Sequence, residues 1–159
     1  MDMRRVVTRQ RSGRSEVLHD GRPAKVFGGG GYEFGEVWST EAPAPEFGSD
    51  VDRTQEFAEF STDIKPGETR FRLCEFPVGM DAPMHATPTI DYITVLGGAI
   101  DLELEDGTEI HLERGDTCVQ RGTKHAWHNR GTEPFRMAVV MIGSEAPAAP
   151  VAGSSEAGG

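Results

Sequence analysis

Hydrophobic and polar residues alternate along much of the chain between residues 69 and 142. Residues 100–105 alternate aliphatic with acidic side chains, which predicts a strand with one solvated face. The Asp-Gly pair at 106–107 predicts a tight hairpin turn, and the alternation resumes over residues 110–112. This stretch therefore predicts a β-hairpin with one buried face.

The rest of the pattern also predicts strands. Residues 135–142 are apolar at nearly every position, which is typical of a strand shielded on both faces. No window of a dozen residues has a helical period, and we expect at most one helical turn within residues 52–60. Short strands separated by Gly-bearing turns indicate a β-sandwich or a β-barrel.

Composition divides the chain into three parts. Brief strands are expected near residues 5–7, 16–18 and 24–27, and residues 39–52 are acidic and Pro-rich, as in a long surface loop. The last sixteen residues are small, Pro- and Gly-rich, and bury too little to fold. We therefore expect N-terminal strands and an acidic loop packed on a barrel over 1–68, the barrel core over 69–143, and a disordered tail over 144–159.

Net charge limits the partners. The 159 residues carry a formal charge of −10, which argues against nucleic acid and anionic membranes as partners. The start of the chain has no apolar leader and no run is long enough to span a membrane, so we expect a cytoplasmic protein. Cys74 and Cys118 have no metal-binding spacing, and we expect both to be free thiols.

Two short motifs carry the candidate chemistry. The first contains His85 and Asp91, and the second, about thirty residues on, contains His125. Two imidazoles and one carboxylate from separate strands of a barrel can bind a metal or move protons. The same trio can also be a hydrogen-bonded polar cluster with no catalytic role.

Taken together, the two motifs resemble those of the cupin superfamily, and specifically its small single-domain bacterial members. Their first motif has the form G-x5-H-x-H-x3-4-E-x6-G, and the second is built on G…PxG-x2-H-x3-N. The matching positions here are Gly79, His85, Asp91, Gly97, Gly115, His125 and Asn129. The resemblance implies an all-β fold, a double-stranded β-helix or jelly-roll cupin barrel with an N-terminal β extension, paired as a homodimer.

The sequence departs from the resembled pattern at the metal ligands. In metal-binding members, three His and one Glu hold the ion; His85 takes the first position and His125 the last. Thr87 replaces the second His and Asp91 replaces the Glu, while Arg121 replaces the proline of the second motif. The resemblance therefore implies a divalent metal (Fe, Zn, Mn or Ni) only on an incomplete ligand set.

Three alternatives follow for the trio. It forms a two-His-one-carboxylate metal site of His85, Asp91 and His125 with open positions. Alternatively, it works without metal as acid and base in a partly dry pocket. In the third alternative, the barrel is a binding or structural module.

Neighbouring side chains are candidates for binding a substrate. Trp127 shares strand parity with His125, so its indole is expected inside the barrel. Thr87 and Thr89 share parity with His85, and Tyr92 follows Asp91 as a possible phenol donor.

From these residues we expect the protein to be an enzyme, and specifically a lyase. It would dehydrate, decarboxylate or enolise a small organic or polyketide-like acid by metal-assisted or acid–base chemistry. Asp91 or His125 would remove a proton beside a carbonyl, while His85, or a metal that it holds, would polarise that carbonyl. The alternatives are a non-haem Fe(II) dioxygenase and a non-catalytic small-molecule-binding protein.

Overall fold

The structure, a computed structural model, describes residues 3–41 and 50–145, so nearly all of the predicted tail at 144–159 lies outside it. The described chain is built of strands and one short 3-10 helix. In chain order, the elements are β1 (Arg5–Arg11), β2 (Arg14–Gly21), β3 (Lys25–Gly29), β4 (Tyr32–Thr40), η1 (Arg53–Glu56), β5 (Thr69–Phe76), β6 (Thr89–Gly97), β7 (Ala99–Leu104), β8 (Glu109–Glu113), β9 (Thr117–Arg121), β10 (His125–His128) and β11 (Phe135–Gly143).

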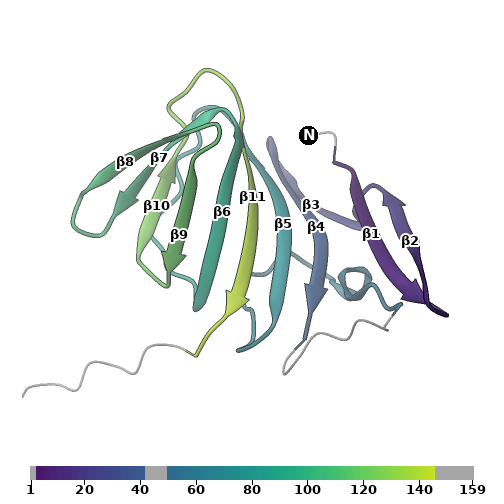
Figure 1. The fold of residues 1–159 in the computed structure, drawn as a ribbon. Coiled ribbons are helices and arrows are strands. Elements are labelled where there is room, and N and C mark those ends of the chain that lie inside the picture. The colour runs from purple at the N-terminus through teal and green to yellow at the C-terminus, as the bar shows by residue number, and fades with distance from the viewer. Residues whose placement is uncertain (1–2, 42–49, 146–159) are drawn as a thin grey trace, which may run out of the picture.

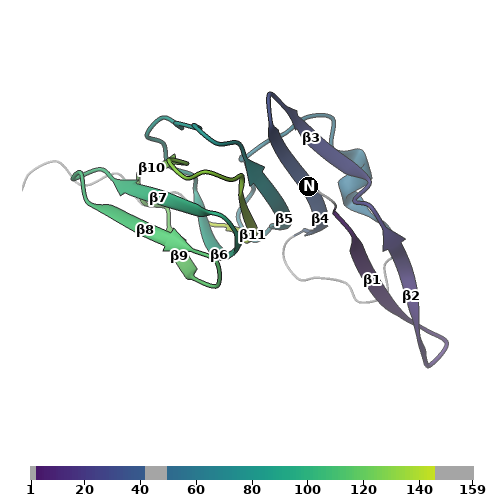
Figure 2. The same cartoon turned by 90° about the horizontal axis from the view of Figure 1, so that it is seen from above.

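The strands form three sheets. The largest has six strands in the order β3-β4-β5-β11-β6-β9, the second has the order β10-β7-β8, and β1 pairs with β2 alone. Figures 1 and 2 show the second sheet facing the β11-β6-β9 end of the first, while the β1-β2 hairpin lies beyond β4. This arrangement is the expected double-stranded β-helix, or jelly roll.

The N-terminal segment contributes two strands to the main sheet. The expected brief strands correspond to β1, β2 and β3, but β4 has no counterpart in the sequence-based expectation. Ser39 and Thr40 belong to β4 rather than to the predicted acidic loop, and residues 42–49 of that loop lie outside the described residues. The hydrogen bonds between β4 and β5 join the N-terminal segment directly to the sheet.

The other predicted elements are observed. β7 and β8 form the predicted hairpin, and Gly107 in its turn has a φ of 82°, a conformation that glycine adopts without strain. The helical turn expected within residues 52–60 is η1, capped by Asp52. Both cysteines are free thiols, as expected.

β11 is only partly as expected. Its residues alternate between buried and half-buried, so one face lies in the core and the other is only partly covered. The outer face of the same sheet exposes apolar side chains at Phe71, Tyr92, Leu96 and Val119. The homodimer stays a prediction, and a second copy bound to this face would bury these apolar side chains.

No helix among residues 3–41 and 50–145 is long and apolar enough to cross a membrane.

A buried ion pair anchors the N-terminal hairpin. The guanidinium of Arg5 on β1 contacts the carboxylate of Asp52, and both residues are 5% exposed. Arg5 also donates to the carbonyl oxygen of Val37 on β4 at 2.9 Å. Asp52 in turn accepts from the backbone N–H of Thr54, which begins the 3-10 helix. One ion pair therefore ties together β1, β4 and η1.

We expect Asp52→Asn to lower the free energy of unfolding by about 3 kcal/mol, because it leaves the buried Arg5 cation unpaired. Burial raises the pKa of Asp52, but the contacts with Arg5 and Thr54 outweigh this effect and lower the pKa to about 2. The stabilisation is therefore present above the pKa of the unfolded chain and is lost as the pH falls towards 2. Urea unfolding between pH 7 and pH 3 measures both effects. The matched control is Asp20→Asn, which breaks the exposed pair with Arg4 and should leave stability unchanged.

Candidate functional site

A cavity of about 230 Å³ lies between the two facing sheets. Side chains of β4, β5, β6, β9, β10 and β11 line it, together with the segments around residues 60–62 and 80–87. Most of the lining is apolar or aromatic; the charged and imidazole side chains are Arg72, Asp91, His85 and His125. Such an apolar cavity with a few converging polar groups is the usual form of a small-molecule site.

The structure brings together the two histidines predicted from the motifs. His85 lies before β6, and its backbone pairs with that of His125 on β10 through two hydrogen bonds of 2.9 and 2.8 Å. Their ring centroids are 4.4 Å apart. In each ring Nδ1 contacts a carbonyl oxygen, that of Pro83 for His85 and of Thr123 for His125. In the neutral rings Nδ1 donates, so each Nε2 keeps its lone pair.

The burial of the two rings differs. His85 is exposed and stands at the open side of the cavity, whereas His125 is 4% exposed. Burial lowers the pKa of His125, and the nearby His85 lowers it further, although its bond to the Thr123 carbonyl opposes the shift. The shift favours the neutral form of His125, which accepts a proton at Nε2.

Asp91 on β6 is a buried carboxyl in the wall of the cavity. It is 5% exposed, and among the described residues its buried Oδ1 has no hydrogen-bond partner. Burial raises the pKa of Asp91; a hydrogen bond with Thr89 and the charges of Arg72 and His85 offset only part of this effect. A buried, incompletely bonded carboxyl is costly for the fold, and such groups are concentrated at functional sites.

The donor set does not fit the predicted metal site. Within residues 3–41 and 50–145, no three His, Cys, Asp or Glu side chains lie close enough together to hold a metal ion. The Nε2 atoms of His85 and His125 would be the two nitrogen ligands of a metal ion, but the Asp91 carboxylate does not lie where it could be the third ligand. A set of His85, Asp91 and His125 would require a rearrangement of side chains.

The predicted substrate-binding residues have different places in the structure. Thr87 and Trp127 line the cavity as expected. Thr89 is buried behind Thr87, with their hydroxyl oxygens 2.8 Å apart. The prediction for Tyr92 is wrong: because Asp91 points inward, strand alternation turns Tyr92 outward, where it is 50% exposed.

Several cavity residues were not predicted from the sequence. Arg72 on β5 is 1% exposed and pairs with Glu36 on β4, which is fully buried. Phe34 and Phe60 come from the N-terminal segment and pack against each other with tilted rings whose centroids are 4.3 Å apart. The alternation of β5 itself was a usable signal, because Arg72 shares parity with Cys74 and Phe76.

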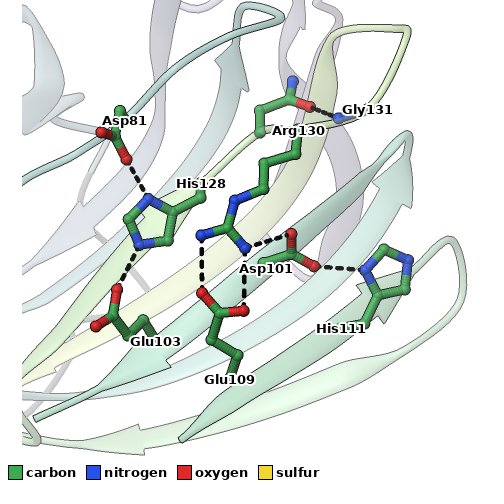
Figure 3. A network of polar contacts seen from close by, with 9 residues as sticks. Asp81, Asp101, Glu103, Glu109, His111, His128, Arg130 and Gly131 are labelled. Carbon is green, nitrogen blue, oxygen red and sulfur yellow. Dashed lines mark hydrogen bonds and ion pairs between the residues drawn. The ribbon is translucent and has the colours of Figure 1, made fainter. Parts of the chain in front are cut away.

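A charged network covers the outer face of the second sheet and holds part of the site in place. Figure 3 shows the His128 ring between the carboxylates of Asp81 and Glu103. Burial lowers the pKa of His128, but the two hydrogen bonds outweigh it and raise the pKa overall. The contact with Asp81 fastens the segment that leads to His85 against β10.

Comparison with known proteins assigns the fold. The sequence profile of the Cupin domain family matches residues 72–142, the part that contains both histidine motifs. Over residues 72–142 the chain is therefore similar to the cupin domain. Among solved structures, the Cnp3 cupin domain of Schizosaccharomyces pombe superimposes with a TM-score of 0.56 at 14% identity, covering 89% of this chain and 88% of that one. The cupin fold thus extends over nearly the whole chain.

The curated relatives are fungal. Phomopsin biosynthesis cluster protein C' of Diaporthe leptostromiformis is 44% identical over 78 residues, which are 48% of this chain and 41% of that protein. The "Cupin-domain-containing oxidoreductase virC" of Hypocrea virens is 33% identical over 110 residues, 67% of this chain and 56% of that protein. The chain thus spans about half the length of these relatives. The narrower resemblance to bacterial cupins is not borne out.

We expect Asp91→Asn to stabilise the protein at pH 7. Because the folded-state pKa of Asp91 is raised, the folded protein holds the proton more tightly than the unfolded chain. The stability that protonated Asp91 contributes to the wild-type fold is therefore lost as the pH rises from the unfolded-state pKa through the folded-state pKa. The neutral amide removes this loss, so the advantage of the variant over the wild type should grow with pH across this window.

Urea unfolding of both proteins from pH 4 to pH 8 measures this difference. Asp101→Asn is the control of opposite sign, since hydrogen bonding to His111 lowers the pKa of Asp101. A constant difference between wild type and Asp91→Asn at every pH would contradict the burial argument.

Proposed function

We propose that the cupin domain is a lyase-type enzyme that moves a proton beside the carbonyl group of a small molecule bound in the cavity. The observation that carries the proposal is that one mainly apolar cavity is lined both by a buried, incompletely bonded Asp91 carboxyl and by His125, whose neutral form is favoured. Titratable groups whose surroundings shift their pKa values in this way commonly supply an acid and a base.

The roles follow from the two environments. Asp91, whose pKa burial raises, serves as the acid that donates a hydrogen bond or a proton to the carbonyl oxygen. His125 Nε2, which carries a lone pair in the neutral ring, removes the proton from the adjacent carbon. The product of this step is an enol, with one proton gained by oxygen and one lost from carbon. An enol also precedes the loss of water from a β-hydroxycarbonyl compound, and it is the first product when a β-keto acid loses CO2.

The apolar lining determines which molecules fit. Aromatic side chains contributed by both sheets and by the N-terminal segment surround the polar groups and would bind a flat, apolar substrate body. His85 stands at the open side, where its Nε2 can contact a substrate that enters. Thr87 and Trp127 remain the proposed substrate contacts among the residues predicted from sequence.

Phenylacetaldehyde is a suitable probe, because it joins a flat ring to an enolisable methylene and a neutral carbonyl. We expect the wild-type protein to accelerate exchange of its α-protons in D2O, followed by proton NMR. Asp91→Asn and His125→Gln should each slow this exchange by about 100-fold or more. His111→Gln, on the exposed outer face, is the matched control and should exchange at the wild-type rate. Undiminished exchange in Asp91→Asn would refute the proposed role of Asp91.

An oxidoreductase is the second candidate, favoured by the 33% identity to a relative named as a cupin-domain-containing oxidoreductase. The alternative of an Fe(II) dioxygenase would need His85, Asp91 and His125 to gather around an ion. The free Nε2 atoms of the two histidines suit such a metal, but the present placement of Asp91 does not.

Metal analysis separates the two candidates. After incubation with Fe(II) or Zn(II) and desalting, we expect the wild-type protein to retain clearly less than one ion per chain, because two imidazoles alone bind a metal weakly. Stoichiometric metal in the wild type that is absent from His85→Ala would instead favour the oxidoreductase.

A further inference from the structure

The guanidinium of Arg72 is the buried cation of the cavity wall. Arg72 lies on β5 and is 1% exposed, yet it lines the same cavity as Asp91 and Trp127. Its charge reaches Asp91, whose pKa it lowers in part against the effect of burial. The acid–base chemistry proposed above assigns no role to this side chain.

The hydrogen bonds of Arg72 are unequal. Its Nε donates to Glu36 Oε1 at 2.7 Å, and its Nη2 donates to the carbonyl oxygen of Ser61 at 2.5 Å. Its Nη1 donates to the thioether sulfur of Met141 at 3.6 Å. A thioether is a weak acceptor, and a buried guanidinium N–H gains far more from a carboxylate oxygen. Met141 also lines the cavity, so a ligand oxygen can reach the position beside Nη1.

The surroundings of Arg72 favour an anion with an apolar body. Glu36 is the direct counter-ion of Arg72, while Arg70 adds a second, half-buried cation on the same side of β5. The ring of Phe60 lies 4.8 Å from the guanidinium carbon of Arg72 and packs on Phe34. A cationic N–H group surrounded by aromatic rings is suited to a planar acid whose charged end meets the cation.

We propose that Arg72 Nη1 is the anchor for a carboxylate of the ligand, in place of the Met141 sulfur, and that the cavity therefore selects small aromatic or otherwise planar acids over neutral analogues. This inference rests on the proposed function in one respect, that the cavity admits a small molecule. It adds the class of that molecule and the direction in which it lies, with its acid group towards β5.

Benzoate and benzyl alcohol are the two probes, since they share a ring and differ in charge. Their binding is followed by the fluorescence of Trp127 in a Trp38→Phe background, which leaves the cavity indole as the sole tryptophan. We expect benzoate to bind at least about tenfold more tightly than benzyl alcohol, as for a charge-assisted hydrogen bond.

Two variants test the anchor in opposite directions. Glu36→Gln keeps an acceptor for Nε but removes the counter-charge, so it should strengthen benzoate binding several-fold and leave benzyl alcohol unchanged. The double variant Arg72→Met with Glu36→Gln removes both charges together and should abolish the preference for benzoate, with folding checked by circular dichroism. Arg4→Gln is the matched control, because Arg4 is exposed, pairs with Asp20 and does not line the cavity, and it should keep the preference within about twofold.

The outcomes separate this inference from the proposed function. Equal binding of both probes to the wild type, or a benzoate preference that survives in the double variant, overturns the role of Arg72 and leaves the proposed enzyme standing. A Glu36→Gln variant that is folded by circular dichroism but shows no gain in benzoate affinity also counts against the anchor, even if the double variant fails to fold. Binding of neither probe overturns the inference together with the proposal that the cavity admits such molecules.

Discussion

The buried ion pair between Glu36 and Arg72 is the contact on which the site depends. Glu36 is fully buried on β4 and Arg72 is 1% exposed on β5, and the two residues are partners in the antiparallel register. Two charges at this depth are tolerated only because they neutralise each other, and loss of one partner leaves the other unpaired and buried. The pair therefore fixes the N-terminal strands against the cupin domain and places a cation in the cavity wall.

This constraint explains why the N-terminal segment is part of the site rather than an accessory. β4 continues the main sheet beyond β5, and its aromatic residues Tyr32 and Phe34 close one side of the cavity. The Arg5–Asp52 pair holds the β1-β2 hairpin and the 3-10 helix in position behind β4. Buried ion pairs thus position the strands that enclose a cavity whose lining is mainly apolar.

The cavity keeps polar groups in states that are costly for the fold. Burial raises the pKa of Asp91 and lowers that of His125, so both are held away from their charged forms. An acid and a base whose charged forms are both disfavoured in one cavity are a poor arrangement for stability and a good one for moving protons. The opposite arrangement is found on the outer face, where His128 and its two carboxylate partners are mutually satisfied.

The sequence by itself determined the strands of the cupin core and the residues His85, Asp91 and His125, because alternation and motif spacing are local properties of the chain. Only the tertiary structure decided how side chains from different strands combine into one cavity. On β5, parity with Cys74 and Phe76 places Arg72 on the inner face and leaves Phe71 38% exposed, but a buried arginine is possible there only beside Glu36 of a strand distant in sequence. Whether a metal site forms also depends on the tertiary structure, since three candidate ligands placed by motif spacing along the chain must also converge in space.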